Sequence, residues 1–112
     1  MKYRFVGNIE KDKLRIIQLS DNEWNLIDLK GNLILTKNCY YIFSLAADGL
    51  KRIKISENEL NLIDKFGNIL LKNNASYISG YFKMGYRIVD GKNWDYKIYL
   101  KQKLIKEIIN GI

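Results

Sequence analysis

The sequence predicts an all-β protein, an antiparallel sheet or open barrel built from three tandem β-hairpin repeats of about 36 residues. The first supporting observation is that residues 24–35, WNLIDLKGNLIL, return at residues 60–71 as LNLIDKFGNILL. The second is that the match continues on both sides of this stretch at the same offset, which a chance hairpin would not show. A weaker third copy completes the chain. We therefore expect a single domain, 1–112, composed of the repeats 1–37, 38–73 and 74–112.

The first repeat contains three expected strands. Residues 3–9 and 14–19 alternate weakly between apolar and polar side chains, which is typical of strands. Residues 24–28 carry apolar side chains on both faces and include Trp24, so they predict an inner strand in the core. Asp28 at the first position and Gly31 at the fourth then indicate a type I turn closed by a left-handed glycine, with the Asp28 carboxylate accepting backbone N–H groups.

The other two repeats follow the same plan. In the second repeat, strands are expected at 40–45, 50–56 and 60–64, the last running into a turn at 64–67 with Phe66 exposed at its tip. In the third repeat, strands are expected at 77–82, 86–90 and 94–100, with Trp94 aligned to Trp24. Residues 102–112 suit either period, and we expect a strand followed by a short helix or tail at this C-terminal end.

This order of residues resembles the bacterial WG (KWG) β-repeat. The positions that carry the resemblance are Lys2-Tyr3, Trp24, Leu26-Ile27-Asp28 with Gly31, Asp48-Gly49-Leu50, and Leu62-Ile63-Asp64 with Gly67. The chain is a divergent member, because the glycine that follows Trp in the pattern is replaced by Asn25, Asn61 and Asp95 in the three copies. The resemblance implies an antiparallel β-repeat fold and a binding surface, and it carries no shared reaction.

The residue types argue against an enzyme. The chain has no His, which is the commonest general base and metal ligand. Its carboxylates fall mostly in turns, and its glycines punctuate turns instead of forming a phosphate-binding loop. The single Cys39 is expected to be a small buried thiol. We therefore expect no catalytic residue, no metal site and no cofactor.

The charge points to a binding surface. The chain has a formal net charge of +7, and residues 74–112 contribute more than half of it, with seven basic and three acidic residues. Basic side chains beside aromatic ones suit single-stranded nucleic acid. The candidate binding residues are Arg87, Lys92, Trp94, Tyr96, Lys97, Tyr99, Lys101 and Lys103. Lys97, Lys101 and Lys103 are expected on one face of an extended strand; alternatively, such lysines only keep an edge strand soluble.

Two functional hypotheses follow. The first is a non-enzymatic module that binds a protein partner, in its narrower form a small phage or mobile-element protein that inhibits a host factor. The alternative is a basic protein that binds single-stranded RNA or DNA through the third repeat. The first thirty residues contain no apolar run of signal-peptide length, and no run in the chain approaches about 18 residues. We therefore expect a cytoplasmic protein, of a bacterium or a phage-infected host, without membrane association.

Overall fold

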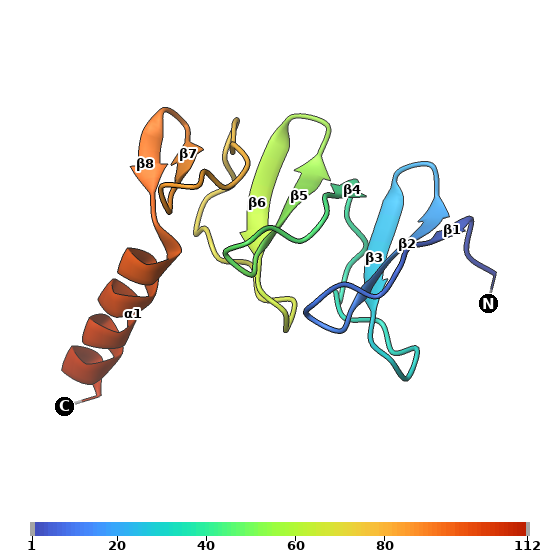
Figure 1. Cartoon of the computed structure of the whole chain (residues 1–112), viewed down its shortest axis with the longest axis horizontal. Coiled ribbons are helices and arrows are strands. Elements are labelled where there is room, and N and C mark those ends of the chain that lie inside the picture. The colour runs from blue at the N-terminus through green and yellow to red at the C-terminus, as the bar shows by residue number, and fades with distance from the viewer. Residues whose placement is uncertain (1, 112) are drawn as a thin grey trace.

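The computed structural model describes residues 2–111 as strands in three small antiparallel sheets followed by one helix (Figure 1). The first sheet contains β1 (Phe5–Val6), β2 (Arg15–Ser20) and β3 (Glu23–Ile27). The second contains β4 (Tyr41–Ile42), β5 (Lys51–Ser56) and β6 (Glu59–Ile63). The third contains only β7 (Arg87–Val89) and β8 (Lys92–Trp94), and α1 (Tyr96–Asn110) follows it. Antiparallel strands are thus confirmed, and no closed barrel forms over the described residues.

The hairpins of the first two sheets have the same register. Arg15 lies opposite Ile27 in the first sheet, and Lys51 lies opposite Ile63 in the second. Both ladders are also interrupted at the same place, one residue before the pair that closes the hairpin. The same local sequence therefore builds the same hairpin twice.

The third sheet corrects two expectations. Its strands pair through a two-residue loop in which Asp90 and Gly91 both have positive φ, 48° and 81°, as in a type I′ turn. This shorter hairpin places Trp94 opposite Arg87. Trp94 thus holds the place of Ile27 and Ile63, and its alignment with Trp24 is wrong. The expected strand at 77–82 is reduced to an isolated bridge between Ile78 and Val89.

The turn at 28–31 forms as predicted. The Gly31 N–H donates to the Asp28 carbonyl at 3.0 Å, and Gly31 has a φ of 85°. The Oδ1 atom of Asp28 accepts hydrogen bonds from the backbone N–H groups of Lys30 and Asn32, both at 2.9 Å. The backbone hydrogen bond from Asn32 is the main reason why the pKa of Asp28 is lowered. Asp28 is therefore a structural residue of the turn.

Gly31 and Gly67 allow a matched test of this turn. Both have a positive φ near 80°, but a Cβ at Gly67 would lie 2.8 Å from the Ile34 side chain, whereas a Cβ at Gly31 meets nothing within 4 Å. We expect Gly31→Ala to destabilise the fold by about 1 kcal/mol through backbone strain alone. Gly67→Ala should cost about 1 kcal/mol more, because Ile34 must also move. Urea denaturation of both variants measures this difference, and equal losses would contradict the contact with Ile34.

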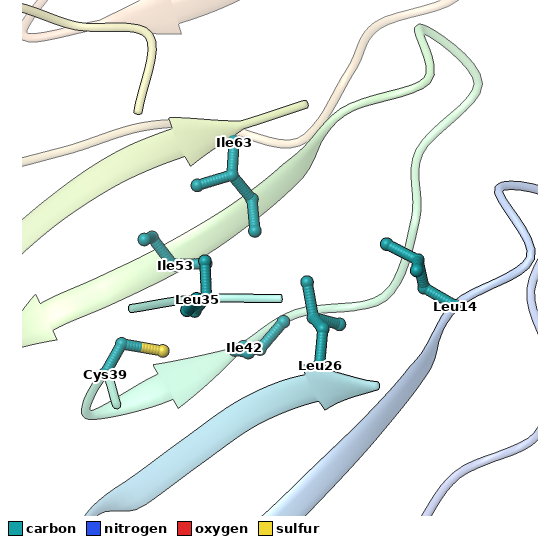
Figure 2. Close-up of a cluster of buried hydrophobic side chains, with 7 residues drawn as sticks. All are labelled: Leu14, Leu26, Leu35, Cys39, Ile42, Ile53 and Ile63. Atoms are coloured by element: carbon teal, nitrogen blue, oxygen red, sulfur yellow. The ribbon is translucent and has the colours of Figure 1, made fainter. Parts of the chain in front are cut away.

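The apolar core lies between neighbouring sheets. Figure 2 shows the first cluster, to which the first sheet, the segment after it and the second sheet all contribute: Leu14, Leu26, Leu35, Cys39, Ile42, Ile53 and Ile63. The half-buried Trp24 packs against this cluster and contacts the rings of Phe5 and Tyr41. A second cluster joins the second sheet to the third and to the start of α1. Each sheet therefore depends on its neighbour for burial, as in stacked repeat proteins.

The C-terminal helix overturns the expected strand at 94–100. Asp95 caps the helix, because its side chain accepts hydrogen bonds from the backbone N–H groups of Lys97 and Ile98. The apolar residues that follow recur at helical spacing, so the alternation over the first few residues was misleading. A helix does form at this end, but it begins earlier and is longer than the short helix expected, with 15 residues, and it replaces the strand expected from residue 102. No helix in residues 2–111 has the length and apolar composition needed to cross a membrane.

Candidate functional site

Helix α1 is attached to the sheets mainly through its first turn. Tyr96 and Tyr99 pack against the second core cluster, together with Trp94. The Tyr99 hydroxyl donates to the Leu70 carbonyl at 3.1 Å. Tyr96 and Tyr99 also stack on each other, with ring centroids 6.2 Å apart. Beyond this turn the helix extends away from the third sheet toward the C-terminus (Figure 1).

The rest of α1 exposes a large amount of apolar surface. None of its residues is buried, and six aliphatic side chains are 43–64% exposed. At about 100° per residue, five of them fall within an arc of about 140°. We call these five the helix apolar face: Ile98, Leu104, Ile105, Ile108 and Ile109. Leu104, Ile105, Ile108 and Ile109 are neighbours on this face, whereas Lys97 and Lys101 enter the same arc nearer to Ile98. Clustered exposed apolar side chains of this kind mark interaction sites.

A groove runs between α1 and the segment 69–72. Its volume is about 550 Å³. We call it the helix groove, and it is lined by Ile69, Leu70, Leu71, Lys72, Tyr99, Gln102, Lys103, Ile105 and Lys106. Three of these side chains are basic and none is acidic, so the groove combines an apolar surface with positive charge.

The structure separates the residues expected to bind nucleic acid. Arg87 is buried in an ion pair, so its guanidinium is not available to a ligand. Trp94, Tyr96 and Tyr99 lie close together, but they are half-buried against one another and against the core. Lys92 is exposed on β8, away from the helical lysines in the sequence.

The three helical lysines do not share one face. Lys97, Lys101 and Lys103 are all exposed, but they belong to α1 and not to an extended strand. On a helix, Lys97 and Lys101 lie one turn apart, whereas Lys103 is rotated by about 160° from Lys101. Only Lys103 lines the helix groove. The expected continuous basic face of a strand is therefore wrong.

Sequence reasoning missed two buried ion pairs that join neighbouring sheets. Arg87 binds both carboxylate oxygens of Asp48 at 2.7 Å, and the two side chains are 1% and 5% exposed. Lys51 forms the corresponding pair with Asp12, between the second sheet and the first. The signal was present in the sequence, because Asp12 and Asp48 stand 36 positions apart, as do Lys51 and Arg87. These charges hold the stack together and form no open site.

Cys39 is a buried thiol, as expected. Burial raises its pKa to about 11, so the reactive thiolate is scarce at neutral pH. We expect a thiol reagent at pH 8 to modify the native protein about a hundredfold more slowly than the urea-unfolded protein. The absorbance of the chromophore that the reagent releases on reaction with the thiol measures both rates. Rapid stoichiometric modification of the native protein would show that Cys39 is accessible.

The described residues contain no group of three or more His, Cys, Asp or Glu side chains placed to hold a metal ion. Comparisons of the chain with protein-family models, curated proteins and solved structures find no match. The similarity to the WG β-repeat therefore stays a prediction from the residues. The surface of α1 and its groove are the basis for a functional proposal.

Proposed function

We propose that the chain is a non-catalytic module that binds a protein partner through α1. The observation that carries this proposal is that a 15-residue helix buries none of its residues while it exposes the helix apolar face. Complete burial of one Leu or Ile side chain stabilises a complex by about 1.5–3 kcal/mol, so several half-exposed side chains offer substantial binding energy. An isolated helix of about 12–15 residues is also only marginally stable, so a partner packed along α1 would stabilise it.

The division of the chain into three repeats is also part of this proposal. The three sheets are the remnants of three WG-like repeats, 1–37, 38–73 and 74–112. The shared register of the first two hairpins supports the first two repeats. The third hairpin is shorter, and α1 takes the place of its missing strand. A terminal repeat has no neighbour on one side, which allows such a replacement.

Several side chains that could perform chemistry have structural roles, which supports a binding function. Asp28 and Asp64 each accept two backbone hydrogen bonds in a turn. Burial raises the pKa of the Cys39 thiol, which makes it a poor nucleophile. A single-stranded nucleic acid is the less favoured partner. The rings proposed to stack on bases already pack against one another, and Arg87 is neutralised by Asp48.

A pull-down with three baits tests the proposal. The baits are the wild type, a helix variant with Leu104, Ile105, Ile108 and Ile109 all changed to Gln, and Phe66→Gln. Glutamine retains helix propensity while it removes the apolar surface. Phe66 is a matched control, because it is an apolar side chain 71% exposed on a turn outside α1. We expect wild type and Phe66→Gln to retain the same protein from an extract of the source organism, and the helix variant to lose it.

Two results would contradict the proposal. One is equal recovery of the partner by all three baits, with circular dichroism showing that the helix variant is folded. The other is salt-dependent binding of mixed-sequence single-stranded RNA or DNA with no protein retained. In that case log affinity should fall with log salt with a slope near −0.7 for each phosphate contacted.

A further inference from the structure

We propose that the helix groove receives an acidic amphipathic helix of the partner protein. This inference rests on the proposed function and deepens it, because it names the chemistry of a partner segment that docks beside α1. The groove shares only Ile105 with the helix apolar face, so it extends the proposed contact to the neighbouring side of the helix. The groove is lined by apolar side chains together with Lys72, Lys103 and Lys106. Its occupant must therefore supply both aliphatic side chains and carboxylates.

The first step concerns the apolar contacts. Ile69 and Ile105 line the groove from opposite sides, and both are about half exposed. Leu70 and Tyr99 join these sides, through the hydrogen bond from the Tyr99 hydroxyl to the Leu70 carbonyl. The groove is thus anchored at one end by the docked first turn of α1. Aliphatic side chains at helical spacing can enter it from the open side.

The second step concerns charge. Lys72 stands on one wall, and Lys103 and Lys106 stand on the other. No carboxylate lines the groove to neutralise them. A partner that places Asp or Glu beside its aliphatic residues would pair with these lysines, and the attraction would also orient it. A basic segment would be repelled by these three lysines, and a neutral segment would leave them without a counter-charge.

The third step concerns the conformation of the occupant. The backbone N–H groups of Leu70 and Leu71 already donate to the Leu62 carbonyl and to Asn61 Oδ1. Their carbonyls accept hydrogen bonds from Tyr99 and Asn61. This wall therefore offers an extended peptide no free backbone ladder. A helix satisfies its own backbone and needs only side-chain contacts, and α1 is about 22 Å long, enough for several turns.

The fourth step concerns a second copy of the chain as the occupant. Each chain carries a net charge of +7, and α1 contains Lys97, Lys101, Lys103 and Lys106 against the single Glu107. Pairing two such helices brings like charges together, which opposes association. An acidic helix from a different protein is electrostatically complementary.

A displayed library of helical peptides tests the inference. Each peptide has about 18 residues and a fixed Leu stripe at helical spacing, with flanking positions randomised equally among Glu, Lys, Gln and Ser. Selection on the wild-type protein is expected to enrich Glu over Lys at the flanking positions. The best peptide is then synthesised with a fluorophore and its Kd is measured by anisotropy.

Matched charge reversals locate the binding site. We expect Lys103→Glu with Lys106→Glu to weaken peptide binding at least about tenfold, and Ile105→Glu to do the same. The control is Lys97→Glu with Lys101→Glu, which makes the same charge change outside the groove lining and should alter the Kd of the selected peptide by less than about twofold. These two lysines lie within the arc of the helix apolar face, so a peptide that bound that face in place of the groove would respond to them instead. Circular dichroism of all variants checks that α1 is retained.

Several outcomes would overturn the inference. These are no enrichment, enrichment of Lys, or equal weakening by both lysine pairs. A dimer in sedimentation velocity that Ile105→Glu dissociates would assign the groove to a second copy, and single-stranded RNA binding lost in the Lys103/Lys106 variant would assign it to nucleic acid. If the helix variant loses the pull-down partner while the groove variants retain it, the proposed function stands and the groove inference alone fails.

Discussion

Asp48→Ala is expected to lower the free energy of unfolding by about 3–5 kcal/mol, because it leaves the Arg87 guanidinium buried without a counter-charge. Arg87 is only 1% exposed and makes two 2.7 Å hydrogen bonds to this carboxylate. Its remaining hydrogen bond, from Nη1 to the Ser79 carbonyl at 3.2 Å, involves a neutral acceptor and cannot replace the lost charge. Urea denaturation, monitored by tryptophan fluorescence, measures the loss in the free energy of unfolding.

Asp21→Ala is the matched control for this prediction. Asp21 pairs with Arg4 at the surface, where the two side chains are 84% and 56% exposed. Removal of this carboxylate should change the free energy of unfolding by less than about 1 kcal/mol, because water solvates the remaining charge. The double variant Asp48→Leu with Arg87→Met should recover much of the loss, since it removes both buried charges. Equal small losses for Asp48→Ala and Asp21→Ala would show that the Arg87 pair is not buried in solution.

Asn25→Ala is expected to destabilise the fold by about 3 kcal/mol, because several buried backbone groups lose their hydrogen-bond partner. The Oδ1 atom of Asn25 accepts from the N–H groups of Leu26 and Leu35 at 2.7 and 3.0 Å. Its Nδ2 atom donates to the Leu35 carbonyl at 3.1 Å and to Asn38 Oδ1 at 2.7 Å. Asn61 makes the same four contacts in the second sheet, so Asn61→Ala should have a similar effect.

Asn22→Ala is the control for Asn25→Ala, because Asn22 is exposed in the adjacent hairpin loop. Its expected effect is within about 0.5 kcal/mol. Asn25→Gly introduces the residue that the WG pattern has at this position, yet it should be as damaging as Asn25→Ala because neither residue replaces the side-chain amide. Chemical denaturation of the four variants decides the point. A stable Asn25→Gly protein would show that the buried amide of Asn25 is dispensable. The backbone alone would then shape the segment around Leu35.

Much of the strand and turn pattern could be predicted because it depends on neighbouring residues. The turns at 28–31 and 64–67 follow from an Asp whose side chain binds N–H groups two and four residues later, and from a Gly that accepts positive φ. The α1 boundary was missed because Trp94, Tyr96 and Ile98 alternate as they would in a strand. Asp95 was the residue that indicated a helix instead, because its side chain can cap a helix by accepting hydrogen bonds from the first free backbone N–H groups.

The candidate site was predicted only in part. The sequence pointed to residues 74–112, which contain the helix apolar face, but the groove lies between α1 and residues 69–72. It could not show which lysines share a surface, because that depends on whether the residues step by 180° in a strand or by about 100° in a helix. Lys103 and Lys106 flank the groove with Lys72, which is about 30 residues earlier in the chain and was not a candidate.

The sequence by itself determined the repeated hairpins of the first two sheets, their turns and the excess of positive charge, since each depends on residue types and short-range geometry. Only the tertiary structure decided that Arg87 is a buried partner of Asp48 and not a ligand-binding cation. These residues are 39 positions apart, and their charges meet only when neighbouring sheets stack. The same holds for the helix groove, which exists because the first turn of α1 docks on the second core cluster while the rest of the helix stays uncovered.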